Sequence, residues 1–255
     1  MLRVLCSRLL GKGVHHVPHS KNFLLNRLDA ATLDRLSPNL SIVDLPLGEV
    51  LAETHARIEK VYFPHSGIIS CVVETIGGGA IETGMIGKDG AFGCSQALDD
   101  KVSLNHVVIQ VPAKVSVISS DLIRQMANEL PVFRGLLVKY EQFFLAQVQQ
   151  TAACNALHNV QARTCKWLLR MHGLAGDELP LTQEFLAQMM GVRRTTVTEV
   201  ALELQKAGMI AYGRGRVRIL DIEFIRERAC QCDGDIQSHY RRIFHSNEAD
   251  VALAT

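Results

Sequence analysis

The chain has 255 residues with 47% hydrophobic content, which is long enough for two domains that each bury a core. No apolar run approaches the ~20 residues needed to span a bilayer, so we predict no membrane partner. The 27 basic and 26 acidic residues leave a formal net charge of +1, which by itself favours no class of partner.

Residues 1–21 mix basic and apolar side chains, but their apolar run is too short and too interrupted for a secretory signal. We predict a flexible N-terminal extension here. His15, His16 and His19 could chelate a metal, yet the segment supplies no partnering ligands. We therefore predict no metal site.

Residues 22–130 are predicted to form a β-rich domain. Glycine and proline turns separate six short strand candidates, at 41–45, 60–63, 68–73, 80–85, 106–111 and 113–118. A short helix over 31–36 precedes them, and another over 120–128 follows. Regularly spaced strands of this kind favour an antiparallel roll or barrel.

A long helix is predicted over 132–157, where there is no proline and only one glycine, Gly135. Its apolar stripe is close to a heptad pattern and consists of Phe133, Leu136, Leu137, Tyr140, Phe144, Val148, Thr151 and Leu157. The stripe could pack on the helix's own β-domain. Alternatively, residues 132–157 of two chains could pair in a homodimer.

The segment 159–228 is predicted to be a winged helix-turn-helix, followed by a C-terminal tail over 229–255. Thr182 can cap a first helix over 183–190, and Gly191 follows where a positive φ is easiest to accommodate. A second helix buries Val197, Val200 or Ala201, and Leu204. Two short strands around the sequence GRGR complete the segment, in the order of a fold that lays its second helix in the DNA major groove.

The exposed face of the second helix carries groups that can read base edges, because arginine can donate two hydrogen bonds to guanine while threonine and glutamate suit other bases. The predicted base-reading residues are Arg194, Thr195, Thr198 and Glu199. The predicted phosphate-contacting residues are Thr182, Gln183, Arg193, Thr196, Arg214 and Arg216. Surface arginines on a short helix pair are often only solvated. The prediction therefore depends on the whole series of features in this order: the turn glycine, the adjacent arginines, the hydroxyl-rich face, the buried stripe and the basic hairpin.

The charge distribution supports double-stranded DNA as the partner. Residues 22–130 hold 8 Lys and Arg against 13 Asp and Glu, whereas residues 193–218 hold 6 against 2. A local basic segment on an otherwise acidic protein is suited to specific DNA binding. Counter-ion release supplies affinity at the basic segment, while the rest of the surface does not attract DNA.

Seven cysteines lie at positions 6, 71, 94, 154, 165, 230 and 232. An odd number without a regular framework indicates the reducing cytoplasm rather than a disulfide scaffold. Cys230 and Cys232 form a CxC pair with no second pair nearby in the sequence. We predict a structural or incidental role for this pair.

The chain resembles the Crp/Fnr superfamily of bacterial transcription regulators over about residues 22–228. The C-terminal pattern T-Q-E-x-L-A-x-x-x-G-x-x-R-x-T-V is matched from Thr182 to Val197, and VYFPHSG at 61–67 and GKDGAFG at 87–93 carry the resemblance in the β-rich half. The resemblance implies an α+β fold with an N-terminal antiparallel β-roll (a jelly-roll), a long dimerisation helix and a C-terminal winged helix-turn-helix. It also implies a homodimer on a palindromic DNA site, control by an effector or by redox state, and RNA polymerase as a partner.

In this comparison Arg194 corresponds to the family's guanine-reading arginine. Thr195 and Glu199 stand where many members have glutamate and arginine, so we expect a different target sequence. The resemblance places a candidate effector pocket at Phe92, Gly93, Cys94, Ser95, Asn105 and His106.

Members that bind cyclic nucleotides use a glutamate for the ribose hydroxyl and an arginine for the cyclic phosphate. Here Phe92-Gly93 is followed by Cys94-Ser95, and the stretch 103–106 has no arginine. A buried phosphate without a cation is costly, so we expect that cyclic AMP does not bind tightly.

We predict no cofactor. An iron–sulfur cluster needs four suitably placed thiolates, and the N-terminal segment offers only Cys6. Haem could be held by His65 or His106, although either could be an ordinary core or surface histidine. Cys94 could be a redox-sensitive thiol, although a small residue in a glycine turn needs no such role.

The alternative function is that of a metal-dependent cupin-like enzyme, since a β-roll can host such chemistry. That reaction needs a His-x-His pair with a nearby carboxylate and a later histidine. His55, His65 and His106 show no such grouping. We therefore predict that the protein is not an enzyme.

Overall fold

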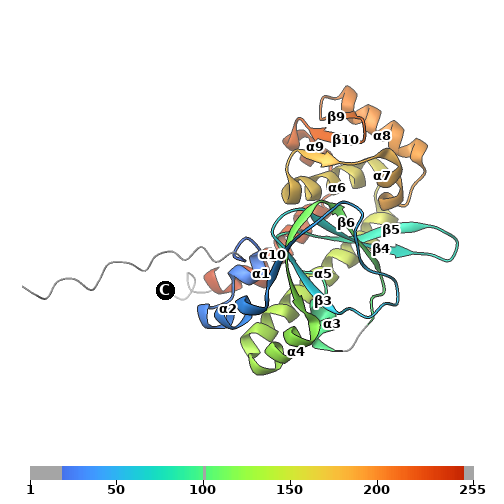
Figure 1. Ribbon diagram of the computed structural model, residues 1–255. Helices are drawn as coiled ribbons and strands as arrows, with labels where there is room; N and C mark the ends of the chain where they lie inside the picture. The colour runs from blue at the N-terminus through green and yellow to red at the C-terminus, as the bar shows by residue number, and fades with distance from the viewer. Residues whose placement is uncertain (1–18, 100–101, 250–255) are drawn as a thin grey trace, which may run out of the picture.

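The computed structural model describes residues 19–99 and 102–249, so Cys6, His15 and His16 lie outside the described residues. The fold is α+β: a β-roll lies beside the long helix α5, and a smaller domain with three short strands follows it (Figure 1). The strands are β1 Ser41–Leu45, β2 Val50–Ala52, β3 Lys60–Pro64, β4 Ile68–Glu74, β5 Ala80–Ile86, β6 His106–Val111, β7 Ala113–Ser119, β8 Glu178–Pro180, β9 Ile210–Gly213 and β10 Arg216–Ile219. The helices are α1 Phe23–Asn26, α2 Ala30–Leu36, the 3-10 turn Ser37–Asn39, α3 Cys94–Leu98, α4 Ser120–Glu129, α5 Pro131–Leu157, α6 Val160–Ala175, α7 Gln183–Met190, α8 Arg194–Lys206, α9 Ile222–Arg228 and α10 Cys232–Ala249.

Two antiparallel sheets form the roll, with the strand orders β1-β7-β3 and β2-β6-β4-β5. Ile69, Ile109 and Val115 belong to one buried cluster that draws on both sheets, and none of them is exposed to solvent. The predicted α+β fold with an N-terminal antiparallel roll is thus confirmed, and all six predicted strands are present. Strand β2, which has only three residues, was not among the predicted strands.

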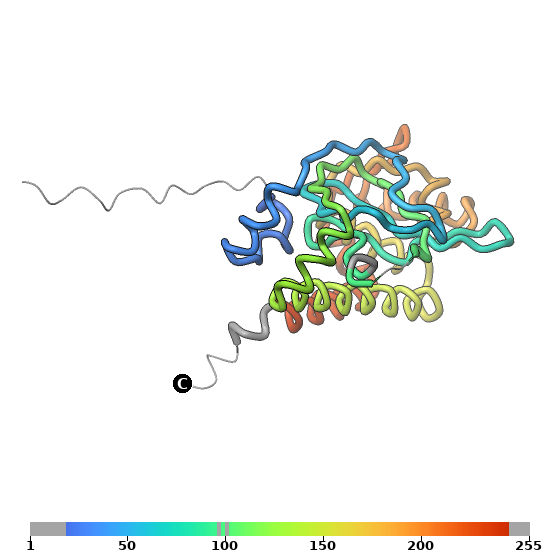
Figure 2. Tube along the Cα trace, turned by 60° about the horizontal axis from the view of Figure 1, so that its bottom comes forward, coloured from blue at the N-terminus to red at the C-terminus, as the bar shows by residue number. Residues whose placement is uncertain are grey.

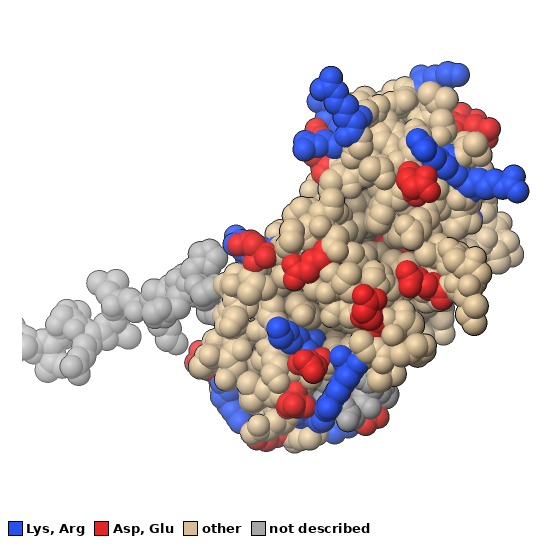
Figure 3. All heavy atoms as spheres, turned by 45° about the vertical axis from the view of Figure 1, so that its right-hand side comes forward, with Lys and Arg blue, Asp and Glu red and all other residues tan. Residues whose placement is uncertain are grey.

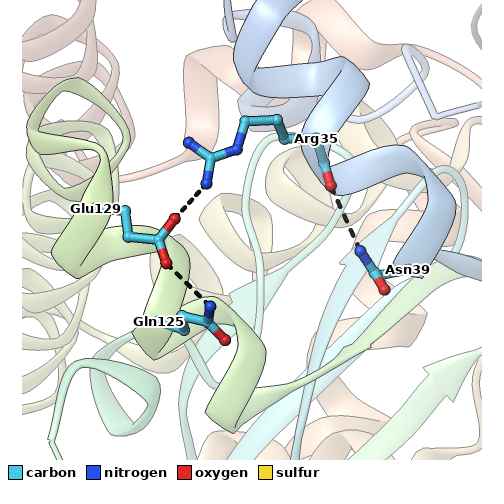
Figure 4. Close-up of polar contacts among 4 residues, drawn as sticks. All are labelled: Arg35, Asn39, Gln125 and Glu129. Atoms are coloured by element: carbon cyan, nitrogen blue, oxygen red, sulfur yellow. Dashed lines mark hydrogen bonds and ion pairs between the residues drawn. The ribbon is translucent and has the colours of Figure 1, made fainter.

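A network of polar contacts connects the N-terminal helices to the end of the roll (Figure 4). Arg35 on α2 forms an ion pair with Glu129 at the end of α4, and Gln125 donates a 2.9 Å hydrogen bond to the same carboxylate. Asn39 donates to the backbone carbonyl of Arg35. All of these contacts are exposed, so we expect them to orient α2 more than to stabilise the fold.

The chain is already packed at residue 19, although we predicted a flexible extension through residue 21. His19 is 6% exposed, and its Nδ1 lies 2.7 Å from Ser116 Oγ, which is also 2.7 Å from Nε2 of His65. Asn22 caps α1 and donates to the backbone carbonyls of Pro64 and Gly90. These hydrogen bonds replace the water that the buried polar groups lose.

Helix α5 begins at Pro131, where a missing backbone N–H has no cost, and continues without a break to Leu157. Phe133, Leu137 and Tyr140 from the predicted apolar stripe are buried in the chain's own core. A second apolar set on α5 is exposed instead, with Val138 at 41% and Leu145 at 56%. These two residues are separated by one heptad.

The segment after residue 229 is a helix rather than a tail. Figure 2 shows α10 running alongside α5, and the two helices are in contact. Tyr240 and Phe244 pack with Phe143 of α5 and Phe23 of α1, with ring centroids 4.9–6.3 Å apart. The aromatic pair at i and i+4 supplies the apolar face that an otherwise polar helix needs in order to dock.

The roll and the C-terminal domain share a continuous core. Ile68, Val72 and Met85 of the roll belong to the same buried cluster as Leu168 of α6 and Met189 of α7. Among the helices of residues 19–99 and 102–249, none is long and apolar enough to cross a membrane.

Candidate nucleic-acid interface

Helices α7 and α8 are joined by a tight turn whose local signals are visible in the sequence. The Thr182 hydroxyl accepts a 3.1 Å hydrogen bond from the Phe185 N–H and caps α7, which begins and ends at the predicted residues. Gly191 has a φ of 62° and closes α7 in the left-handed conformation that glycine adopts without strain. Thr182 and Gly191 thus define α7, which packs against α8 across the turn.

Helix α8 has one buried and one exposed face. Val197, Val200, Ala201 and Leu204 are buried, as predicted. Arg194, Thr195 and Glu199 are exposed, together with Arg193 just before the helix. The turn therefore presents two guanidinium groups, and α8 adds a hydroxyl and a carboxylate to the same solvent-facing side.

Thr198 and Thr196 are only partly exposed. The Thr198 hydroxyl lies 2.9 Å from the Gln183 side-chain oxygen and 3.0 Å from the Arg194 carbonyl. The first of these hydrogen bonds links the first turn of α7 to α8. Thr198 is therefore engaged within the domain and is less available for a base than Thr195.

The wing consists of β8, β10 and β9 in that order, all antiparallel. Its tip is the two-residue turn Arg214-Gly215, in which both residues have positive φ, at 51° and 73°. Such turns match the twist of the flanking strands, but a non-glycine residue at positive φ is uncommon. Arg214, Arg216 and Arg218 are exposed, and Arg218 makes a 3.9 Å ion pair with Glu178.

A shallow cleft separates the start of α7 from the wing, and its lining includes Gln183, Arg194, Gln205, Tyr212 and Arg214. The Gln205 side chain accepts a 2.7 Å hydrogen bond from the Tyr212 N–H. The Tyr212 hydroxyl is buried and has no hydrogen-bond partner among the described residues. Tyr212 and Gln205 were missed by the sequence analysis, because only the folded hairpin places them beside Arg194.

Basic side chains project from the surface of the C-terminal domain. In Figure 3, Lys and Arg extend from the end that holds this domain, where a few acidic groups also lie, and both signs of charge are spread over the roll. Arg194 lies 3.9 Å from Glu184, but both side chains are more than two-thirds exposed. Such a pair contributes little and can open when another anion approaches.

Among the candidate effector residues, Phe92, Gly93 and Cys94 are buried, and Ser95, Asn105 and His106 are only partly exposed. Cys94 is fully buried, and burial raises the pKa of its thiol well above the ordinary value, which disfavours the reactive thiolate. The Ser95 N–H donates to Glu141 of α5, and His106 pairs with Glu53 at 2.9 Å. Phe92 is also buried, in the core of the roll.

His65, one of the two haem candidates, lies inside the roll and is 7% exposed. Burial lowers the pKa of its imidazole, and the neighbouring His19, Lys21 and Lys114 lower it further. Its Nε2 is occupied by the contact with Ser116. A haem iron at this nitrogen would have to displace that contact.

The comparisons with known proteins agree with this geometry. Residues 162–228 match the model of the Crp-like helix-turn-helix domain. No curated protein matches the chain in sequence.

Three solved structures share the fold. A protein assigned to the Crp/Fnr family from Eubacterium rectale is 17% identical with a TM-score of 0.65, over 82% of this chain and 99% of that one. FixK2 from Bradyrhizobium japonicum is 12% identical with a TM-score of 0.64, over 75% and 98%. The c-di-GMP responsive regulator CLP from Xanthomonas campestris is 16% identical with a TM-score of 0.59, over 75% and 99%. The chain thus has the fold of the Crp/Fnr transcription regulators and carries their Crp-like helix-turn-helix domain, as the sequence resemblance predicted.

Proposed function

We propose that the protein is a sequence-specific, dimeric DNA-binding transcription regulator. The observation that carries this proposal is the exposed polar face of α8 beside a basic wing, on a Crp-like helix-turn-helix domain. In this class of domain the second helix enters the major groove. Contact with RNA polymerase remains a prediction from the resemblance, and a cytoplasmic location remains a prediction from the cysteines.

In this proposal Arg194 reads a guanine, and Thr195 and Glu199 contact neighbouring bases. A guanidinium can donate two hydrogen bonds to guanine O6 and N7, whereas glutamate can accept from cytosine N4. Thr198 contributes mainly by holding α8 against Gln183, because its hydroxyl already has two partners. Thr195 and Glu199 give this chain a target different from that of members with glutamate and arginine there.

The phosphate contacts come from two sides of α8. Thr182 and Gln183 lie at the N-terminus of α7, where the helix dipole favours an anion. Arg193, Thr196, Arg214 and Arg216 add donors around the turn and on the wing.

We place the dimer interface on the exposed face of α5 rather than on the predicted stripe. Val138 and Leu145 are exposed at heptad spacing, and Ala152 continues the row one heptad further on. Pairing two such helices would cover these side chains and bring two copies of α8 to a separation of roughly 34 Å, one turn of DNA.

We also infer that the control of this regulator is not cyclic AMP. Cys94, which replaces the family's ribose-binding glutamate, is buried in the core, and the candidate pocket residues include no arginine. A calorimetric titration of the purified protein should show no micromolar binding of cyclic AMP. Micromolar affinity would overturn this part of the proposal.

Selection from a library of random DNA duplexes tests the proposed function. The full chain should enrich an inverted repeat with half-site centres about 10–10.5 base pairs apart. The Lys206→Ala variant, altered at the far end of α8, should enrich the same repeat, whereas Arg194→Ala should lose the selected guanine. Recovery of no common sequence by the wild-type chain would contradict the proposal.

Sedimentation equilibrium tests the dimer surface separately. Leu145→Glu should shift the protein from dimer to monomer, because two carboxylates would face each other across the paired helices. Leu202→Glu is the matched control, since Leu202 is similarly exposed, at 48%, but lies on α8. A Leu145→Glu protein that stays dimeric would show that α5 pairs through another face or not at all.

A further inference from the structure

Four potential metal ligands meet where α5, α9 and α10 come together. Cys154 and His158 are one helical turn apart at the end of α5, Cys230 follows α9, and Cys232 opens α10. Their ligand atoms all lie within 4.8 Å of one another. The Cys154 and Cys230 sulfurs are 3.4 Å apart, and the Cys232 sulfur lies 3.5 Å from Nδ1 of His158.

The two shortest separations match those around a single tetrahedral ion, and small side-chain shifts would bring the other pairs from 4.8 Å or less to the same spacing. Zinc binds thiolate sulfur at about 2.3 Å and imidazole nitrogen at about 2.0–2.1 Å, which places neighbouring ligands of a tetrahedron roughly 3.5–3.8 Å apart. An iron–sulfur cluster spreads its ligands over several irons and needs wider spacing. Three thiolates and one imidazole are a common ligand set of closed, four-coordinate structural zinc sites.

The surroundings can hold such a site. Cys154 and Cys232 are 2% and 1% exposed, Cys230 is 9% exposed, and His158 is half-buried. Zinc with three thiolates carries a net negative charge, and Arg163 is 8% exposed and near enough to interact electrostatically with Cys154 and Cys230. Arg163 and Lys166 also line the same cavity as Cys154. Buried positive charge beside the cysteines offsets that excess.

We propose that Cys154, His158, Cys230 and Cys232 bind one zinc ion in each chain. The ion would join the end of α5 to the junction of α9 and α10. That is also the point at which the chain leaves α5 for α6 and the DNA-binding domain. The zinc site would therefore hold α10 against α5. It would also set the direction in which the chain passes from α5 into the DNA-binding domain.

Elemental analysis of the full chain, purified without a polyhistidine tag or chelator, tests this proposal. We expect about one zinc per chain in the wild type. Cys232→Ser and His158→Ala should each lose most of it. Cys165→Ala is the matched control, because Cys165 is buried in neighbouring α6 but lies outside the group of four, and it should retain the zinc.

Two further measurements keep the test independent of folding defects in the variants. Wild-type protein stripped with a chelator and refilled with Co²⁺ should develop the intense visible bands of a tetrahedral thiolate site, and refilling with Zn²⁺ should restore the melting temperature lost on stripping. His158 is half-buried, so His158→Ala can be checked for an unchanged circular dichroism spectrum before its zinc is measured.

Three results would overturn the proposal. The first is a wild-type chain without zinc in which Cys154 and Cys230 form a disulfide. The second is equal zinc in the wild type and in both ligand variants. The third is iron with acid-labile sulfide in place of zinc, which would mean a cluster.

Discussion

The face of α8 and the interior of the roll differ in how far their polar and ionisable side chains are exposed to solvent. On α8, Arg194 and Thr195 point to solvent and leave their donors available to a ligand. In the roll, Cys94 and His65 are buried and occupied by packing or by a hydrogen bond. The exposed groups on α8 are therefore accessible to a binding partner, whereas the thiol of Cys94 and the imidazole of His65 are not.

The largest expected effect comes from Arg194→Ala. Removal of a bidentate guanine interaction should cost about 1–3 kcal/mol per half-site, or roughly 2–6 kcal/mol for a dimer on both half-sites. Fluorescence anisotropy on the selected repeat and on a scrambled duplex measures this. Lys206→Ala should keep the wild-type ratio of the two affinities. An Arg194→Ala protein that also keeps this ratio would show that Arg194 does not discriminate between the two duplexes.

Glu82 connects the roll to α6, because its carboxylate accepts hydrogen bonds from Ser70 of the roll at 2.5 Å and from Trp167 of α6 at 2.7 Å. Burial raises the pKa of Glu82 from 4.5 to about 7, although these two hydrogen bonds oppose the shift. The folded state thus favours the protonated form. The stabilisation that comes from the raised pKa of Glu82 is fully present below pH 4.5, and it is lost as the pH rises through 7.

In the wild type, the free energy of unfolding should fall by about 3 kcal/mol as Glu82 ionises above pH 7, given a pKa difference of this size. Glu82→Gln cannot ionise and should not show this fall. Thermal unfolding from pH 4.5 to 8 should therefore show the variant gaining on the wild type as the pH rises. Glu74→Gln, at the exposed end of β4, should follow the wild type. A constant difference between Glu82→Gln and the wild type would show that Glu82 does not titrate in this range.

The smallest expected effect is at the wing tip. Arg214→Ala and Arg214→Gly both remove one charge per chain, so each should reduce the steepness of log affinity against log salt by about 1 per half-site, or about 2 for a dimer on both half-sites. Arg214 has a positive φ, so the glycine variant should be about 1 kcal/mol more stable than the alanine variant. Calorimetry and salt titrations separate the two effects. A changed preference for the selected repeat would mean that Arg214 reads bases.

The helix-turn-helix could be predicted from residues that lie close together in the sequence. The capping hydroxyl of Thr182 and the left-handed turn at Gly191 lie within one helix of each other, so α7 follows from the sequence alone. For α5, the sequence showed an apolar stripe but not what covers it. Phe133 and Tyr140 turn out to be covered by their own chain, and Leu145 is left exposed.

The cysteine and histidine group could not be predicted from spacing. Cys230 and Cys232 meet partners 76 and 74 positions away in the sequence, and only the docking of α10 on α5 brings them together. The docking of α10 nevertheless has a local signal in the sequence. Tyr240 and Phe244 are spaced at i and i+4, which is the spacing of a helix that packs on one face.

The most direct test of the central claim combines Arg194→Ala with changes in the DNA. In the selected half-site each guanine is replaced in turn by 7-deazaguanine, which lacks the N7 acceptor. At the guanine that Arg194 contacts, the replacement should weaken binding of the wild-type chain by about 1 kcal/mol, the typical value of one hydrogen bond. The same replacement should leave the affinity of Arg194→Ala unchanged. Equal losses in the two proteins at every guanine would contradict the claim that Arg194 reads DNA from α8.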